Sequence, residues 1–392
     1  MALSFNASRR LTRLAAVLAG AAMAVSTFAT SAATLKLGVI APLTGPGAPW
    51  GLAAAEGPKI LAKEINDKGG LKVGDQTYQV EVVAYDDQYK TAEAVAAYNR
   101  LVNQDDVHYM IILSSAATMA LKQNVQDDGV IALTSAYTAK ALDPDNQNMF
   151  RLYSAPADYL PSFISWMKKN IDGKRVVIVN PNDETGWDQT RLSDAEFKKN
   201  GFEVVGQELF ERAQKDFQPM LTKIIALNPD FIELGGTSPA TAGLIIRQAR
   251  ELGYKKLFTK TGGAGPWEIV ASAGPEAAEG TINMLYANPE NPGFQRIAAA
   301  YKASRGNPPN EIIVSFYDGA HVLLNAIQAA GTVDDTKKVA AAFSKALPMD
   351  SVQGDKMTFG GKTHYGVDAQ IMTVNYIGTI RNGKPVVLGK TE

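Results

Sequence analysis

The chain has 392 residues, of which 46% are hydrophobic, and its formal net charge is -1. This length and composition allow two or three domains with substantial cores and exclude a mainly disordered chain. Because the charges are balanced and form no basic block, nothing indicates the electrostatic surface of a nucleic-acid-binding protein, and small partners fit better.

The first segment is typical of an export signal. Arginines among residues 9–13 precede an apolar, alanine-rich run at residues 14–28, and small residues follow up to Ala33. This order predicts a signal peptide over residues 1–33. Paired arginines also occur in twin-arginine signals, but Thr12 stands where that motif has a large apolar residue. We therefore expect the general secretory route, with the twin-arginine route as the alternative.

Cysteine is absent from the sequence. No disulfide can therefore form, and no lipid-bearing cysteine can anchor the mature N-terminus. No later stretch approaches the run of about 18 apolar residues that a membrane helix needs. We expect an unanchored protein in a bacterial periplasm, with secretion into the medium as the alternative.

Short apolar strands then alternate with helical patterns. Strands are expected at residues 35–41, 78–85, 108–113, 130–134, 175–180, 203–210, 230–235, 256–260 and 281–286. Helical periodicity lies between them, as in residues 92–104 and in residues 240–253, which Gly253 closes. The alternation favours an α/β fold with parallel sheets covered on both faces. From about residue 290 to 346 the pattern is helical, and a final strand pair is expected at residues 367–378 and 384–388.

Two of these strands end in hydroxyl side chains. ILSSAATMALKQ, residues 111–122, contains Ser114 and Ser115, and VIALTSAYTAKAL, residues 130–142, continues from Thr134 to Thr138. Each stretch predicts a strand, a short polar turn and a helix. Parallel sheets bind ligands at the carboxyl ends of their strands, where helix N-termini offer free N–H groups to a carboxylate. The hydroxyls could also be simple helix caps, but two such turns on successive strands favour a shared site.

Several segments, in this order, resemble one known family. They are LKLGVIAPLTGPGAPWG, KEINDKGGLKVG, VVAYDDQ, LSSAAT with TSAYT, KDFQPMLTKIIALNPDFIELGG and RQARELG, and together they resemble the periplasmic leucine/isoleucine/valine-binding proteins of ATP-driven importers. This resemblance implies the type I periplasmic binding protein fold, in which two Rossmann-like lobes with parallel-sheet cores are joined by a three-strand hinge. Lobe one would comprise residues 34–156 and 287–367, and lobe two residues 157–286 and 368–392.

The resemblance also implies roles for residues of the first lobe. Ser115 would bind the ligand carboxylate, Ala136 would contact the ligand through its backbone, and Thr138 would complete the pair. Ser114 lies in the same turn as Ser115 and is expected in the same site. Trp50 stands where the amino-acid binders place a tyrosine against the ligand side chain, and a core aromatic is the alternative interpretation.

The second lobe departs from the family pattern. Thr185 and Thr237 replace two tyrosines of the amino-acid binders, and we expect both threonines and Gly262 to line the site. The acid that receives the ligand ammonium should fall near TKTGGAG, residues 259–265, which contains no acid. A buried ammonium without a counter-charge is costly. We therefore expect an aromatic or other organic acid without an ammonium, with a branched-chain or other hydrophobic amino acid as the alternative.

Acidic residues elsewhere could still receive an ammonium, although each also has an ordinary role at the surface or as a helix cap. The candidates are Asp183, Glu184, Glu233 and Asp318. Lys260 could lie near the second-lobe face of the site.

The expected function is capture of a small carboxylate between the lobes and its delivery to the membrane permease of an ABC importer, by a monomer without cofactor or metal. We expect no enzyme and no catalytic residue. A dehydrogenase is a distant alternative, because glycines 45, 47 and 51 are one residue off the dinucleotide fingerprint. A serine hydrolase is another, but G-x-S-x-G is absent and only His108, His321 and His364 could act as a base.

Overall fold

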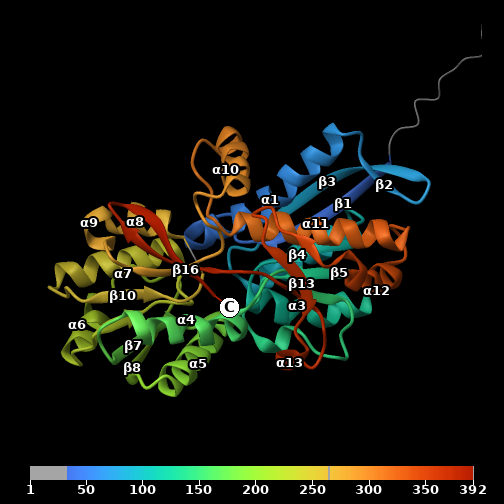
Figure 1. Cartoon of the computed structure of the whole chain (residues 1–392). Coiled ribbons are helices and arrows are strands. Elements are labelled where there is room, and N and C mark those ends of the chain that lie inside the picture. Colours follow the sequence, from blue (N-terminus) through green and yellow to red (C-terminus); the bar gives the residue numbers. More distant parts are fainter. Residues whose placement is uncertain (1–32, 264, 392) are drawn as a thin grey trace, which may run out of the picture. The chain divides into compact units, whose positions relative to one another are not determined.

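Two β-sheets organise the part of the chain that this computed structural model describes, residues 33–263 and 265–391 (Figure 1). The predicted signal peptide, residues 1–33, lies outside the described residues except for Ala33, which begins the first strand. Within those ranges, no helix has the length and apolar composition needed to cross a membrane.

The first sheet has nine strands in the order β12-β13-β14-β6-β5-β4-β1-β3-β2. From β14 through β6, β5 and β4 to β1 the neighbouring strands are parallel. In chain order the strands are β1 (Ala33–Ala41), β2 (Leu71–Val73), β3 (Gln76–Asp86), β4 (Tyr109–Ile112), β5 (Ile131–Thr134), β6 (Met149–Arg151), β12 (Met349–Asp350), β13 (Lys356–Gly360) and β14 (Gln370–Met372).

The second sheet has seven strands in the order β16-β15-β11-β10-β9-β7-β8. Its strands are β7 (Arg175–Pro181), β8 (Glu203–Phe210), β9 (Phe231–Glu233), β10 (Leu257–Lys260), β11 (Ile282–Leu285), β15 (Tyr376–Arg381) and β16 (Lys384–Lys390). The first five are parallel, and the last two add an antiparallel edge. Strands β8-β7-β9-β10-β11 repeat the order β3-β1-β4-β5-β6 of the first sheet, so each sheet has a switch point beside its first strand, where ligands bind in such sheets.

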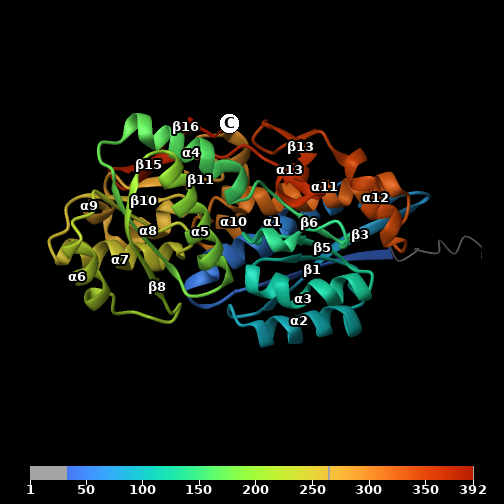
Figure 2. The same ribbon diagram turned by 90° about the horizontal axis from the view of Figure 1, so that it is seen from below.

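Helices cover both faces of the sheets. Figure 2 shows α2 and α3 on one side of the first sheet and α11 and α12 on the other. The helices are α1 (Ala48–Asp67), α2 (Thr91–Asn103), α3 (Ser115–Asp127), α4 (Pro156–Asn170), α5 (Glu184–Lys199), α6 (Gln218–Ala226), α7 (Pro239–Glu251), α8 (Pro266–Ala273), α9 (Pro275–Ala278), α10 (Pro292–Arg305), α11 (Ile313–Ala330), α12 (Thr336–Ala346) and α13 (Lys362–Tyr365), with 3-10 turns η1 (Gly45–Gly47) and η2 (Ala139–Ala141).

The chain passes between the two sheets three times: after β6, after β11, and between β14 and β15. The predicted fold class, α/β with two sheet-based lobes and three crossings, is confirmed. We propose the lobe ranges given above as the domain division. The last crossing, at residues 373–375, lies a few residues beyond the proposed boundary at residue 367.

The nine strands expected before residue 290 are all present, but one expected helix is wrong. After β5 the chain forms only the three-residue turn η2, whereas the helix α3 follows β4 as expected. The segment DPDNQN, residues 143–148, explains the difference, because Asp, Asn and Pro favour turns over helix. The strands β2, β6, β12 and β13 were not expected, since charged residues interrupt their short sequences and no apolar run marks them.

A glycine in the first turn of a helix packs against the end of the first parallel strand in each sheet. A Cβ on Gly51 of α1 would lie 1.9 Å from the carbonyl oxygen of Pro42, and a Cβ on Gly186 of α5 would lie 1.9 Å from that of Pro181. Only a residue without a side chain permits this approach. Trp50 and Thr185 directly precede these glycines, so the close packing fixes where both side chains point.

We predict that Gly51→Ala lowers the free energy of unfolding by about 3 kcal/mol, because the new methyl group meets backbone that cannot rotate away. The control is Gly201→Ala, where φ is +83° but no atom lies within 4 Å of the added Cβ, and the expected loss is about 1 kcal/mol. Denaturant unfolding measures both values. Equal losses in the two variants would contradict the assigned role of Gly51.

Candidate functional site

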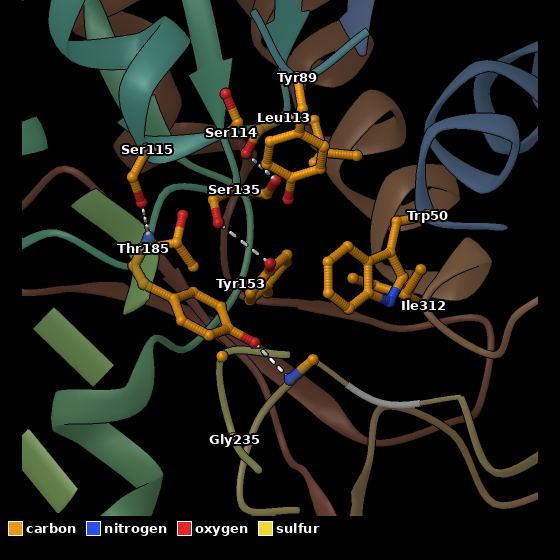
Figure 3. A pocket seen from close by; sticks show the side chains of 13 residues that line it. Trp50, Tyr89, Leu113, Ser114, Ser115, Ser135, Tyr153, Thr185, Gly235 and Ile312 are labelled. Carbon is orange, nitrogen blue, oxygen red and sulfur yellow. Dashed lines mark hydrogen bonds between the residues drawn. The ribbon is translucent and has the colours of Figure 1, made fainter. Parts of the chain in front are cut away.

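A pocket lies where loops from both sheets meet (Figure 3). Residues that follow strands β1, β3, β4, β5, β6, β7, β9 and β10 contribute to its wall, as a site at a switch point requires. The described lining residues are Trp50, Tyr89, Leu113, Ser114, Ser115, Ser135, Tyr137, Tyr153, Thr185, Gly235, Gly236, Gly263 and Ile312.

Serine hydroxyls gather at one end of the pocket, where α3 begins. The Ser114 side chain caps this helix by accepting the Ala117 N–H at 3.1 Å. The Ser115 hydroxyl accepts the Tyr137 N–H at 3.0 Å, and this bond leaves its own hydrogen free to donate. Ser135 donates to the Leu113 carbonyl at 2.7 Å, which ties the turns after β4 and β5 together. This end of the pocket can therefore receive an anion.

Aromatic rings form the body of the pocket. Figure 3 shows Trp50, Tyr89 and Tyr153 around the space that the serines border. The Tyr153 hydroxyl donates to the Ser135 carbonyl at 3.1 Å, so its polar end is satisfied and its ring is left to face a ligand. The rings make this part of the pocket suitable for an apolar or aromatic group.

Tyr137 joins the turn after β5 to the loop after β10. Its hydroxyl accepts the Gly263 N–H at 2.5 Å and shares a hydrogen bond of 3.1 Å with the Tyr286 hydroxyl. Burial raises the pKa of Tyr137, so the phenol stays neutral. One side chain from the first sheet thus holds the glycine loop that closes the pocket on the second-sheet side.

Lys260, which is fully buried at the end of β10, lies behind that glycine loop. Its ammonium donates to the carbonyls of Gly262, at 2.5 Å, and of Gly263, and it lies 5.6 Å from the centre of the Trp50 ring. Burial lowers the pKa of Lys260 to about 7, although the nearby carboxylates of Glu233 and Glu311 act in the opposite direction. A cationic group therefore lies against the pocket wall below that pH.

The four acids that could have received an ammonium have other contacts. Asp183 caps α5 and binds Arg212, and Glu184 pairs with Lys140 at 3.1 Å. Asp318 accepts the Val352 N–H at 2.9 Å. Glu233 is fully buried, and its two oxygens accept hydrogen bonds from Thr259 and from both the N–H and the hydroxyl of Thr261. None of these acids is among the described lining residues.

The structure brings together half of the residues that the sequence predicted for the site. Trp50, Ser114, Ser115 and Thr185 line the pocket, and Trp50 lies in the first turn of α1 rather than in a loop. The other four predicted residues, which lie outside the described lining, are Ala136, Thr138, Thr237 and Gly262.

These four residues are engaged elsewhere. The Ala136 N–H donates to the Thr134 hydroxyl at 2.9 Å, and the Thr138 hydroxyl caps η2. Thr237 donates to the Val179 carbonyl at 3.3 Å, and the Gly262 carbonyl accepts from Lys260. Their roles as ligand contacts stay predictions.

Several lining residues were not predicted. Ser135 and Tyr137 belong to the same turn as Ala136, and they could have been found by testing every residue of that turn. Tyr153 follows β6, whose sequence MFR forms no apolar run, and Ile312 precedes α11 without any motif. Tyr89 lies three residues after β3, beside the recognised VVAYDDQ segment, but nothing in that segment predicts its direction.

Comparisons with known proteins agree with this architecture. Residues 34–384 match the family of periplasmic binding proteins. The Leu/Ile/Val-binding protein of Escherichia coli is 30% identical over 346 residues, which cover 86% of this chain and 90% of that protein.

Solved structures share the fold. The leucine-binding protein LivK of Thermotoga maritima has a TM-score of 0.78 at 23% identity, and the match covers 92% of this chain and 99% of the other. A solute-binding protein of an ABC transporter from R. palustris, in complex with benzoate, has a TM-score of 0.77 at 23% identity and covers 91% and 96%. The predicted family is confirmed: the chain belongs to the periplasmic binding proteins and is a substrate-binding protein of the ABC-transporter type.

Proposed function

We propose that this protein captures a small organic acid without an ammonium group, aromatic or aliphatic, and delivers it to the permease of an ABC importer. The observation that carries the proposal is the charge around the pocket. None of its thirteen described lining residues is acidic, and a buried lysine lies against its wall. An amino acid would have to bury its ammonium there without a counter-charge, which is costly, whereas a carboxylate would lie near a positive charge.

The ligand carboxylate is placed at the N-terminus of α3. The first N–H groups of this 13-residue helix and the free hydrogen of Ser115 point to the serine end of the pocket. The helix dipole adds a partial positive charge. Thr185, on the second-sheet side, supplies another hydroxyl, so one anion can contact elements of both sheets.

The rest of the ligand is placed among the rings of Trp50, Tyr89 and Tyr153. Burying roughly 150 Å² of apolar ligand surface contributes on the order of 4 kcal/mol at ~25 cal/mol/Å². Association itself costs at least about 4 kcal/mol, so the apolar contact alone leaves little net affinity. The carboxylate interactions must therefore supply most of the measurable binding.

A branched-chain or other hydrophobic amino acid is the second candidate. The E. coli relative is named for leucine, isoleucine and valine, and the sequence similarity to it spans most of both chains. The fold serves other ligands as well, since the R. palustris structure contains benzoate. Because no described lining residue is acidic, the pocket favours an organic acid over an amino acid.

The transport role is one of binding and release, without a chemical step. A ligand that contacts both lobes shifts the protein toward its closed form by its extra affinity for that form, and a permease can recognise the difference. We propose that the protein acts in the periplasm as an unanchored monomer after cleavage following Ala33.

The first prediction on ligand binding compares leucine with 4-methyl-2-oxopentanoate, its 2-keto acid. The two differ at the carbon that carries the ammonium, so we expect the keto acid to bind roughly a hundredfold more tightly, a difference of about 2.7 kcal/mol. Isothermal titration calorimetry of residues 34–392 measures this, with 4-coumarate as an aromatic acid in the same series. Tighter binding of leucine would reject the proposal and support the amino-acid alternative.

The second prediction concerns the carboxylate site. Ser115→Ala removes a donor to a charged group and should weaken acid binding about tenfold to a hundredfold, or 1.5–3 kcal/mol. Thr138→Ala should have the smaller effect, because Thr138 does not line the pocket. Ser162→Ala is the matched control, since its hydroxyl donates to the Tyr159 carbonyl in α4 outside the pocket. If Thr138→Ala weakens binding more than Ser115→Ala, the carboxylate has been placed wrongly.

The third prediction is a pH dependence. Lys260 loses its charge as the pH rises through about 7, and Glu311, whose pKa burial raises to about 8, gains a negative charge as the pH rises further. Burial also raises the pKa of Glu268, and Arg212 stays cationic. The ligand carboxylate is ionised throughout, so acid affinity should fall about tenfold from pH 6 to pH 9. Calorimetry at both pH values checks this, and an affinity that rises with pH would contradict it.

A further inference from the structure

Tyr89 lies at the boundary between the ligand pocket and a second, larger space. That space, of about 1040 Å³ with the adjoining open solvent included, is lined by residues at the end of β8 and in the loops after β1, β3, β8 and β9, and by Thr241 of α7. Among the described residues, Tyr89 alone belongs to both linings. Its ring is thus the shared wall of the two spaces.

The backbone at Tyr89 is held in an unusual conformation. Gln88 and Tyr89 have φ of +49° and +59°, which residues with side chains rarely adopt. Two carboxylates hold them there, because Asp86 accepts the Gln88 N–H and Asp87 accepts the Tyr89 N–H, each at 2.9 Å. Asp87 is itself fully buried. Strain that is held in place by several bonds is typical of functional positions and here fixes the direction of the Tyr89 side chain.

The ring of Tyr89 is clamped on two sides. A Cβ on Gly47 would lie 2.7 Å from its Cε2 atom, so the ring rests directly on backbone. The Arg212 guanidinium lies 4.1 Å from the ring centre, and Asp183, the cap of α5, binds Arg212 at 3.2 Å. A cation over a ring face is favourable, particularly where both are shielded from water. The contacts of the Tyr89 ring with Gly47 and Arg212 hold it between the two spaces, and the contact with Arg212 links the loops after β3 and β8.

The second space differs in chemistry from the pocket. Its lining includes three charged side chains, Lys90, Glu211 and Arg212, whereas the described lining of the pocket has none. Thr44, Gln88, Ser238 and Thr241 add further polar groups, and the ring of Phe210 adds apolar surface. A ligand extension that reaches it would meet apolar surface together with hydrogen-bonding and charged groups.

We propose that Tyr89 determines the length of the ligand: its clamped ring ends the pocket, restricts it to short acids, and excludes acids whose tails would extend into the second space behind it. This inference rests on the proposed function, since it takes the acid end to lie at α3.

Two rigid acids of the same design test the proposal. The short probe is 4-hydroxybenzoate, and the long probe is 4'-hydroxybiphenyl-4-carboxylate, which adds one ring and keeps both polar ends. Wild-type protein should bind the short probe and not the long one. Tyr89→Ala should bind the long probe at least tenfold more tightly than wild type does, and calorimetry measures both. Tyr89→Phe keeps the ring over Gly47 and should still exclude the long probe.

Wild-type protein that binds the long probe as tightly as the short one would overturn the proposal, as would a Tyr89→Ala variant without the gain. If neither acid binds any variant, the proposed function fails. The role of Tyr89 as a boundary is then tested with a dye that reports whether the space beyond the pocket is accessible. Anilinonaphthalene sulfonate should then brighten with Tyr89→Ala and not with wild type or Tyr89→Phe. Equal fluorescence in all three would reject the boundary. Near-UV circular dichroism must be unchanged, because partly unfolded protein also brightens this dye.

Discussion

The site depends on one packing constraint that occurs in both sheets: a helix begins so close to the end of the preceding strand that only glycine fits between them. Gly51 and Gly186 lie against the carbonyl groups of Pro42 and Pro181, and the residues before them, Trp50 and Thr185, are carried into the pocket. Helix N-termini and strand ends therefore converge on one small volume. The rest of the site follows from which side chains the other loops add there.

The proposed ligand class depends on the charges behind the pocket wall. Glu233 is close to the wall, but three hydrogen bonds from Thr259 and Thr261 already occupy its oxygens. Lys260 is hydrogen-bonded to the carbonyls of the glycine loop that forms the wall itself. Lys260 while protonated and the N-terminus of α3 each favour an anion, whereas Glu233, Glu268 and Glu311 oppose it to the extent that they are ionised. In the proposed function, selectivity depends on the environment of the wall as well as on the groups that touch the ligand.

The fold was largely predictable because its signals are local. Apolar strands, helical periodicity and the helix-ending Gly253 each depend on a few neighbouring residues. The nine strands expected before residue 290 were found near their observed bounds. The helix expected after residue 138 failed because DPDNQN favours a turn. Half of the predicted site residues line the pocket. The missing members, such as Tyr153 and Ile312, are brought there by long-range packing, which no local pattern encodes.

The direct test of the account is a crystal structure of the mature protein grown with 4-methyl-2-oxopentanoate. The account predicts the ligand carboxylate at the N-terminus of α3, within hydrogen-bond distance of the Ser115 hydroxyl, with no acidic side chain against the keto-bearing carbon. A carboxylate bound instead to Lys260, with the aliphatic end toward the serines, would contradict the central claim.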